Sequence, residues 1–264
     1  MNYRFITCST FVNTIIRNDK LFHGKYTADP YQQCAFGCSY CDSSTQDTVT
    51  ITSNAVEQFR TEIPHLKKGT VILGSVHDPY QPAEKTYAIT RGLLRILKEY
   101  DFPCHILTKS PLVLRDLDIL SKLSNCRVTV SLVSLERTVA QVFEKQVPSP
   151  MDRLHAVQTL SEQGIPTGVA LIPVLPFIVD NELESIVLSA SDHQAQYILH
   201  KYLQLKGDQK QRFLGILSNN YPHLVEKYMT LYRNDITPKK TYISEMNKRI
   251  RTYCIHNNIA NTIM

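Results

Sequence analysis

The stretch Cys34-Ala-Phe-Gly-Cys38-Ser-Tyr-Cys41 places three of the seven cysteines of the chain in one short segment. This C-x3-C-x2-C spacing is one that iron–sulfur chemistry uses. Three thiolates on a short loop can each bind one iron of a cubane [4Fe–4S] cluster, which leaves the fourth iron open to a ligand from solution. Gly37 permits the positive φ that lets a backbone wrap closely around such a cluster. The spacing therefore predicts a cluster with an open, catalytic iron, bound by Cys34, Cys38 and Cys41.

Zinc binding, a disulfide and chance clustering are the alternative interpretations of these cysteines. A structural zinc site usually takes four ligands that come as two pairs, and the remaining cysteines, Cys8, Cys104, Cys126 and Cys254, stand alone. A disulfide would leave an odd thiol, and the polar start of the chain does not look like a signal peptide. We therefore expect reduced cysteines and a cytoplasmic protein.

Segments that favour β-strand alternate with segments of helical spacing along the chain. Helical spacing appears, for example, in Val56, Phe59 and Ile63. The predicted strands lie at residues 24–27, 71–76, 105–108, 128–134, 169–175 and 197–203. Alternating strands and helices indicate a parallel sheet with helices outside, and six units are fewer than the eight of a closed barrel. The predicted fold class is therefore α/β, with a partial (β/α)6 TIM-type barrel.

The chain of 264 residues is 43% hydrophobic, which is enough to bury a substantial core. We expect an N-terminal segment at 1–24, the barrel at 25–205 and a C-terminal helical extension at 206–264. Apolar residues in the extension repeat at helical spacing, as in Phe213, Leu214 and Leu217, so its helices need the barrel to pack on. The extension is the predicted cover over the strand ends. No apolar run is long enough to span a membrane.

The cysteine motif, with Tyr40 before the last cysteine, resembles the radical S-adenosylmethionine superfamily. Further segments resemble its spore photoproduct lyase-like branch, which includes DNA repair lyases. These segments are Asp29-Pro30-Tyr31-Gln32-Gln33-Cys34, Gly74-Ser75-Val76-His77-Asp78-Pro79-Tyr80-Gln81-Pro82, Leu107-Thr108-Lys109-Ser110, Pro148-Ser149-Pro150 with Arg153, and Gly164-Ile165-Pro166-Thr167-Gly168. The resemblance implies a [4Fe–4S] cluster and S-adenosylmethionine as cofactors. It also implies an external one-electron reductant of the flavodoxin or ferredoxin type and hydrogen abstraction by a 5′-deoxyadenosyl radical.

The resemblance also implies which residues hold S-adenosylmethionine at the C-terminal ends of the strands. Lys109 and Ser131 match positions that related proteins use, and a lysine suits the carboxylate of the cofactor. Tyr40 and Ala170 match the adenine side. Without the resemblance, Lys109 would be an ordinary solvated lysine at a strand end, and Ser131 and Ala170 would be ordinary strand residues.

Three departures from the family pattern concern the amine side of the cofactor, the adenine pocket and the substrate. Ser75, Val76 and His77 stand where the superfamily often has Gly-Gly-Glu, so we expect backbone carbonyls there to hold the amine. Asp42 follows the last cysteine, where relatives often have an aromatic residue. Spore photoproduct lyases carry a cysteine near the end of the second strand that returns a hydrogen atom to the product, and residues 74–78 contain none.

The net charge of +5 leaves the substrate open, with nucleic acid as one candidate. Basic residues gather in the tail, at Lys239, Lys240, Lys248, Arg249 and Arg251, but such a run is more often the solvent-exposed face of an amphipathic helix, and we favour that interpretation. The alternative function is a non-catalytic iron–sulfur or metal-binding protein that transfers electrons. The predicted cofactor pocket favours the enzyme, because an electron carrier needs no such pocket.

Overall fold

The central sheet of this computed structural model, which describes residues 1–16, 19–44 and 47–263, runs in the order β10-β9-β8-β7-β6-β3-β2. Neighbouring strands from β3 to β10 pair in parallel, and β2 adds an antiparallel strand at the edge beside β3. The strand bounds are β2 Asn13–Thr14, β3 Tyr26–Thr27, β6 Val71–Leu73, β7 Cys104–Thr108, β8 Cys126–Ser131, β9 Thr167–Val174 and β10 Tyr197–Tyr202. The parallel strands are the six that the sequence predicts, so the predicted fold class is confirmed.

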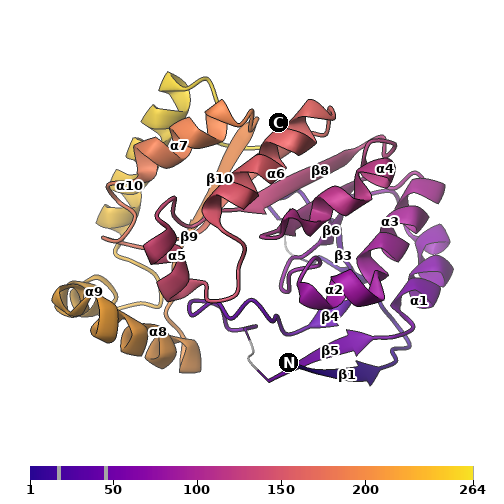
Figure 1. Cartoon of the computed structure of the whole chain (residues 1–264), viewed down its shortest axis with the longest axis horizontal. Helices are drawn as coiled ribbons and strands as arrows, with labels where there is room; N and C mark the ends of the chain where they lie inside the picture. The colour runs from indigo at the N-terminus through magenta and orange to yellow at the C-terminus, as the bar shows by residue number, and fades with distance from the viewer. Residues whose placement is uncertain (17–18, 45–46, 264) are drawn as a thin grey trace.

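Helices pack on the outside of this sheet (Figure 1). Along the chain, they connect each parallel strand to the next. The sheet needs this cover because its strands are buried on both faces, which is typical of parallel sheets. Val71, Ile106, Val128 and Val169 are almost completely buried. The α-helices of this part are α1 Ala55–Glu62, α2 Pro82–Tyr87, α3 Ile89–Glu99, α4 Leu117–Leu120, α5 Arg137–Phe143, α6 Pro150–Glu162 and α7 Leu183–Asp192, with 3-10 turns η1 Ile63–His65 and η2 Pro111–Asp116.

A second, smaller sheet in the order β1-β5-β4 was not predicted from the sequence. Its strands are β1 Asn2–Ile6, β4 Tyr31–Gln32 and β5 Thr48–Thr52. β1 pairs in parallel with β5, and β4 pairs antiparallel with β5. The cysteine segment therefore lies between two strands of this sheet, so both of its ends are anchored.

The second barrel strand is shorter than predicted. It ends at Leu73, whereas the sequence pattern continues to Val76. Gly74 has φ +92°, and a Cβ atom there would lie 2.2 Å from the carbonyl oxygen of Leu107. The chain therefore turns away from the sheet at Gly74, and residues 75–77 belong to a loop at the strand end.

The C-terminal part consists of α8 Gly207–Asn220, a 3-10 turn η3 Pro222–Leu224, α9 Val225–Leu231 and α10 Lys240–His256. Phe213 of α8 is fully buried, and its ring stacks on Phe143 of α5 with 5.4 Å between the ring centroids. α10 packs along α7. Met246 and Ile250 of α10 are buried, as expected for an amphipathic helix with its basic residues outward. The borders of the three predicted parts remain predictions. No helix in the described part of the chain is long and apolar enough to cross a membrane.

Candidate active site at the strand ends

A cavity of about 960 Å³ lies at the C-terminal ends of the barrel strands. The cysteine segment forms one wall, and residues from β10 and α10 form another. The structure brings most of the predicted site residues together here. Those that line the cavity are Cys34, Cys38, Cys41, Tyr40, Ser75, Val76, Lys109 and Ser131.

His77 and Ala170 do not appear among the described residues that line this cavity. Ala170 is fully buried and packs in a cluster with Tyr197 and Leu199. His77 lies in the loop after β6, where burial lowers the pKa of its imidazole. The proposed adenine contact of Ala170 and the backbone contact of His77 remain predictions.

Contacts from three parts of the chain hold the cysteine loop in place. The backbone N–H of Cys34 donates to the carbonyl of Ser43 (2.8 Å), and Cys38 forms a β-bridge with Glu144. From α8, the Gln209 side chain donates to the carbonyl of Tyr40 (2.9 Å) and Arg212 donates to that of Cys41 (2.5 Å). The C-terminal extension therefore contacts the loop directly, as a cover over the strand ends requires.

The three loop thiols are free, and those of Cys34 and Cys38 are buried. Burial, followed by the charge of Asp78, raises the pKa of Cys34 to about 12. Burial, followed by the charge of Glu144, also raises the pKa of Cys38. The thiols of Cys34 and Cys38 would therefore ionise only next to a strong cation, which is what bound iron supplies.

Within the described residues, no three His, Cys, Asp or Glu side chains converge closely enough to hold a single metal ion. A cubane cluster makes a different demand, because each thiolate binds a different iron of the cluster. Three free cysteines around one cavity suit such a cluster better than a mononuclear site.

A buried carboxylate, Glu144, joins the cluster loop to the predicted cofactor residues. The Tyr40 hydroxyl donates to Glu144 Oε1, and Lys109 Nζ lies 3.4 Å from the same oxygen. Arg153 Nη2 lies 2.7 Å from Glu144 Oε2, and Arg153 Nη1 donates to the carbonyl of Ser131 (3.0 Å). Burial alone would raise the pKa of Glu144, but the charges of Arg153 and Lys109 outweigh it, so the pKa lies below its usual value.

Two further carboxylates lie near the loops at the strand ends. Ser75 Oγ donates to Asp29 Oδ2 (3.1 Å), and burial raises the pKa of Asp29 to about 6 despite this hydrogen bond. Asp42, which replaces the aromatic residue expected after the last cysteine, forms an exposed ion pair with Lys206 (2.9 Å). Asp42 therefore links the cluster loop to the start of the C-terminal extension.

Hydrogen-bonded polar side chains of β10 and α10 also line the cavity. Asn247 of α10 accepts a hydrogen bond from the Tyr202 hydroxyl (2.7 Å), and its Oδ1 lies 2.8 Å from His200 Nε2. Among the described residues that line the cavity, the cysteines are Cys34, Cys38 and Cys41, and no other cysteine is present. Cys104 and Cys126 begin β7 and β8, at the other end of the strands, where their sulfur atoms lie 3.4 Å apart and are buried. Neither thiol is among the described residues that line the cavity.

The sequence of residues 29–190 matches the Radical SAM superfamily. The chain belongs to this superfamily. The resemblance seen in the cysteine motif is thereby confirmed, and the protein is an enzyme of the radical S-adenosylmethionine type. Membership implies S-adenosylmethionine and a [4Fe–4S] cluster as cofactors.

Solved structures with the same fold include spore photoproduct lyase in complex with a dinucleoside spore photoproduct. It has a TM-score of 0.72 and 14% identity, over 96% of this chain and 79% of that one. SuiB from Streptococcus suis, bound to its precursor peptide SuiA, has a TM-score of 0.61 and 12% identity, over 89% of this chain and 47% of that one. At these identities the likeness concerns the fold, and it confirms the partial barrel.

Relatives with similar sequences are uncharacterized proteins. One from Mycobacterium tuberculosis is 27% identical over 95% of this chain and 79% of its own length. One from Methanocaldococcus jannaschii is 27% identical over 91% of this chain and 94% of its own length. These relatives match most of the chain, including part of the C-terminal extension.

Proposed function

We propose that this radical S-adenosylmethionine enzyme binds a [4Fe–4S] cluster through Cys34, Cys38 and Cys41, and abstracts hydrogen from a substrate in the adjoining cavity. The observation that carries the proposal is that all three cysteines share one cavity with Lys109 and Ser131. When bound, the cluster and S-adenosylmethionine together supply a 5′-deoxyadenosyl radical and methionine after one electron enters. An external reductant of the flavodoxin or ferredoxin type would provide that electron.

The residues of the chain orient S-adenosylmethionine and keep its surroundings dry. We assign Lys109 to the carboxylate of S-adenosylmethionine, because its side chain is only 13% exposed and it shares the single negative charge of Glu144 with Arg153, which leaves one positive charge in excess. Ser131 lies beside it on the next strand. We assign Tyr40 and Ala170 to the adenine side, and the backbone carbonyls at Ser75, Val76 and His77 to the amine. Tyr40, Ser75 and Val76 line the cavity, whereas Ala170 and His77 lie outside its described lining.

We assign the C-terminal extension as the cover over these residues, because Lys206, Gln209 and Asn247 line the cavity. Gln209 and Arg212 of α8 bind backbone carbonyls of the cluster loop, and Lys206 pairs with Asp42. A radical must be kept away from water and stray hydrogen donors, so a cover at this place suits the chemistry.

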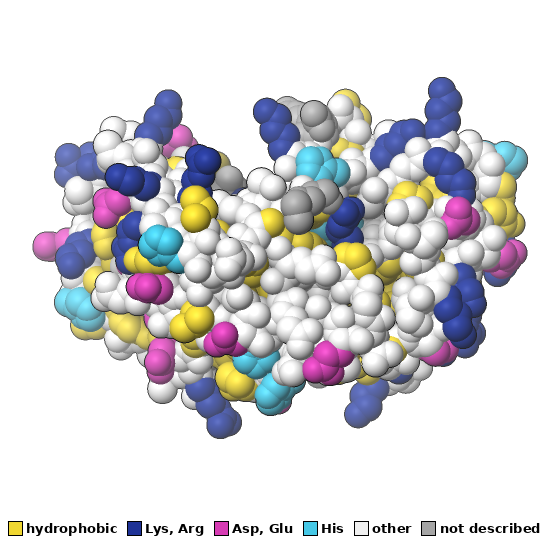
Figure 2. Space-filling model, turned by 90° about the horizontal axis from the view of Figure 1, so that it is seen from above, with side chains coloured by type: hydrophobic (Ala, Val, Ile, Leu, Met, Phe, Trp, Pro, Cys, Tyr) yellow, Lys and Arg dark blue, Asp and Glu magenta, His cyan; other side chains and the backbone are white. Residues whose placement is uncertain are grey.

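We propose nucleic acid as the substrate to test first. One solved neighbour holds a dinucleoside photoproduct and another holds a peptide, so the fold accepts both kinds of substrate. Lys and Arg side chains are spread over the face in Figure 2 without gathering into one patch. Charge reversal at Lys239, Lys240, Lys248 and Arg251 should abolish a salt-sensitive shift of DNA or RNA while sparing 5′-deoxyadenosine formation. No shift with the intact protein at low salt would favour a peptide or small-molecule substrate.

The decisive experiment is anaerobic reconstitution with iron and sulfide, followed by dithionite and S-adenosylmethionine. Mass spectrometry should detect 5′-deoxyadenosine with the wild type and none with Cys38→Ala. Cys104→Ala is the matched control, because it removes a buried cysteine at the other end of the strands and should leave the product unchanged. A cluster without 5′-deoxyadenosine would favour the alternative, an electron-transfer protein.

A further inference from the structure

The segment from Asp78 to Glu84 has no role in the function proposed so far, although the sequence pattern singles it out. It connects the loop after β6 to the first turn of α2. It contacts both the cluster loop and the loop that carries Lys109. The segment therefore contacts both the loop that would bind the cluster and the loop that would bind S-adenosylmethionine, but none of its residues is proposed to bind either cofactor.

The side-chain amide of Gln81 forms hydrogen bonds to the backbone on both sides of Cys34. Its Nε2 donates to the carbonyl of Gln33 (2.9 Å), and its Oε1 accepts the N–H of Ala35 (3.0 Å). The side chain is fully buried, so water does not compete for these bonds. A primary amide can donate and accept at once, which a carboxylate or an apolar side chain of the same length cannot.

Asp78 fixes the start of the Lys109 loop in a similar way. Asp78 Oδ2 accepts the backbone N–H of Lys109 (2.7 Å). Asp78 Oδ1 accepts the Thr108 hydroxyl (2.7 Å) and the backbone N–H of Tyr80 (2.9 Å). The backbone position of Lys109 is thus tied to a residue three positions before Gln81.

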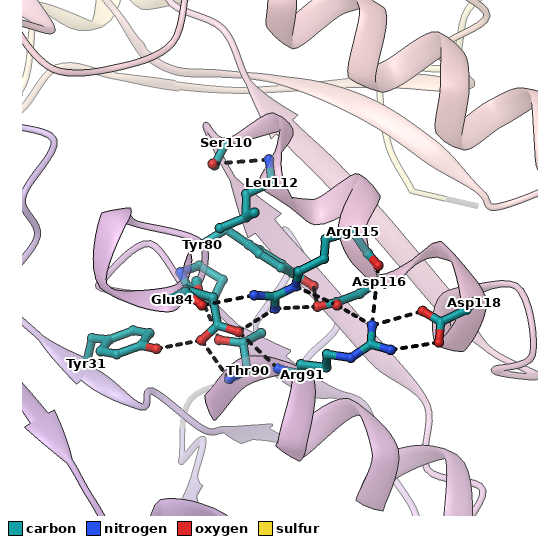
Figure 3. Close-up of polar contacts among 11 residues, drawn as sticks. Tyr31, Tyr80, Glu84, Thr90, Arg91, Ser110, Leu112, Arg115, Asp116 and Asp118 are labelled. Atoms are coloured by element: carbon teal, nitrogen blue, oxygen red, sulfur yellow. Dashed lines mark hydrogen bonds and ion pairs between the residues drawn. The ribbon is translucent and has the colours of Figure 1, made fainter. Parts of the chain in front are cut away.

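A buried network of charges anchors the other side of this segment (Figure 3). The Tyr80 hydroxyl donates to Asp116 (3.0 Å), and Glu84 accepts from both Arg115 (2.6 Å) and Tyr31 (2.5 Å). Tyr80, Glu84 and Asp116 are almost completely buried. A buried and fully paired network of this kind keeps its side chains in one arrangement. The backbone that carries Asp78 and Gln81 is therefore held in place.

We propose that residues 78–84 act as a clamp that sets the position of Cys34 relative to Lys109. Gln81 and Asp78 are positioning residues: one orders the backbone of the first cluster ligand, and the other orders the backbone of the lysine that binds S-adenosylmethionine. The second half of this inference rests on the proposed function of Lys109, whereas the first half concerns the folded chain alone.

Hydrogen exchange tests the contact with Cys34. Full-length protein would be measured by mass spectrometry before and after reconstitution, for the wild type, Gln81→Met and Tyr228→Phe. Gln81→Met keeps the length of the side chain but loses both hydrogen bonds, so the peptide with Ala35 should exchange about tenfold faster. Tyr228→Phe removes a buried hydrogen bond to Pro176 in the C-terminal part and is the control. Equal exchange of the Ala35 peptide in both variants would overturn the clamp.

Gln81→Glu provides a second variant in case Gln81→Met fails to fold. Its carboxylate still accepts from Ala35 but cannot donate to Gln33, so only part of the protection should be lost. Protection equal to that of the wild type would show that the donor side of the amide has no role, which contradicts the clamp.

Binding of S-adenosylmethionine tests the contact with Lys109. In Asp78→Asn, the side-chain amide places an N–H group against a backbone N–H, of Lys109 or of Tyr80. The affinity for S-adenosylmethionine should fall about tenfold while the iron content stays at the wild-type level. Unchanged affinity would remove the link to Lys109. If wild-type protein formed no 5′-deoxyadenosine but the exchange difference persisted, the clamp on Cys34 would stand and the proposed function would fail.

Discussion

Replacing Glu144 by Gln should destabilise the protein through Arg153. Arg153 is 1% exposed, and Glu144 is its carboxylate partner at 2.7 Å. Removing one partner of a buried ion pair costs about 3–5 kcal/mol, because the remaining charge is left uncompensated. Arg153 keeps its hydrogen bond to the carbonyl of Ser131, so the lower end of this range applies. We expect a loss of about 3 kcal/mol in the free energy of unfolding.

Thermal unfolding, followed by circular dichroism under anaerobic conditions, measures this loss. For a chain of this size, 1 kcal/mol corresponds to about 2 °C, so the Tm should fall by about 6 °C at pH 7. Glu162→Gln is the matched control. Glu162 is exposed on α6, the helix that carries Arg153, and within the described residues its side chain accepts a hydrogen bond from Gln158 and forms no ion pair. Its substitution should change the Tm by no more than about 1 °C.

The pH dependence of the Tm distinguishes the effect of the Glu144 charge from the effect of its side-chain shape. The pKa of the folded state lies below the unfolded value of about 4.3, so the stabilisation is complete above that value and is lost as the pH falls through the folded pKa. The difference in Tm between wild type and Glu144→Gln should therefore narrow below about pH 4. A loss under 1 kcal/mol at pH 7, or a difference that stays constant with pH, would refute the reasoning.

Four further predictions follow from the site. Substitution of any loop cysteine by Ala should abolish the cluster, whereas Cys104→Ala should retain it, as measured by iron and sulfide content. Lys109→Ala should weaken S-adenosylmethionine binding about tenfold or more with the cluster intact, because the carboxylate loses a charge-assisted hydrogen bond; unchanged affinity would make Lys109 a bystander. The raised pKa of Asp29, about 6, means that its stabilising contribution is lost as the pH rises through that value, so wild type should lose stability relative to Asp29→Asn between about pH 4 and pH 7. Truncation after Lys206 should cause aggregation or a loosened cluster, seen by gel filtration and iron content, because Phe213 would leave its partner Phe143 exposed.

Local patterns in the sequence were sufficient to predict the barrel. Most of the parallel strands contain a short apolar run, and several of the helices between them show apolar residues at helical spacing, so both signals lie within a few neighbouring residues. The small sheet was missed because β1 lies at the start of the chain with most of its residues exposed and pairs with β5, which is far away in sequence. Pairing between distant segments leaves no periodic signal in either one.

The candidate site likewise contains residues that local sequence patterns predict and residues that they do not. The cysteine spacing is local and identified the loop, the end of a predicted strand pointed to Lys109, and the family resemblance alone pointed to Ser131. Glu144 had no such signal, because a single acidic residue at the end of a short helix is most often exposed. Its importance appears only when Tyr40 and Arg153 are seen to meet it in the folded chain.

The residues that the sequence could not identify are those that join distant parts of the chain. The Tyr40–Glu144 contact spans 104 positions, and the Arg212–Cys41 contact spans 171. Both contacts act on the cluster loop, one from the barrel and one from the C-terminal extension. A protein can therefore keep the cysteine motif and still lose the arrangement around it. The surroundings of the loop, and α8 in particular, belong to the site as much as the cysteines do.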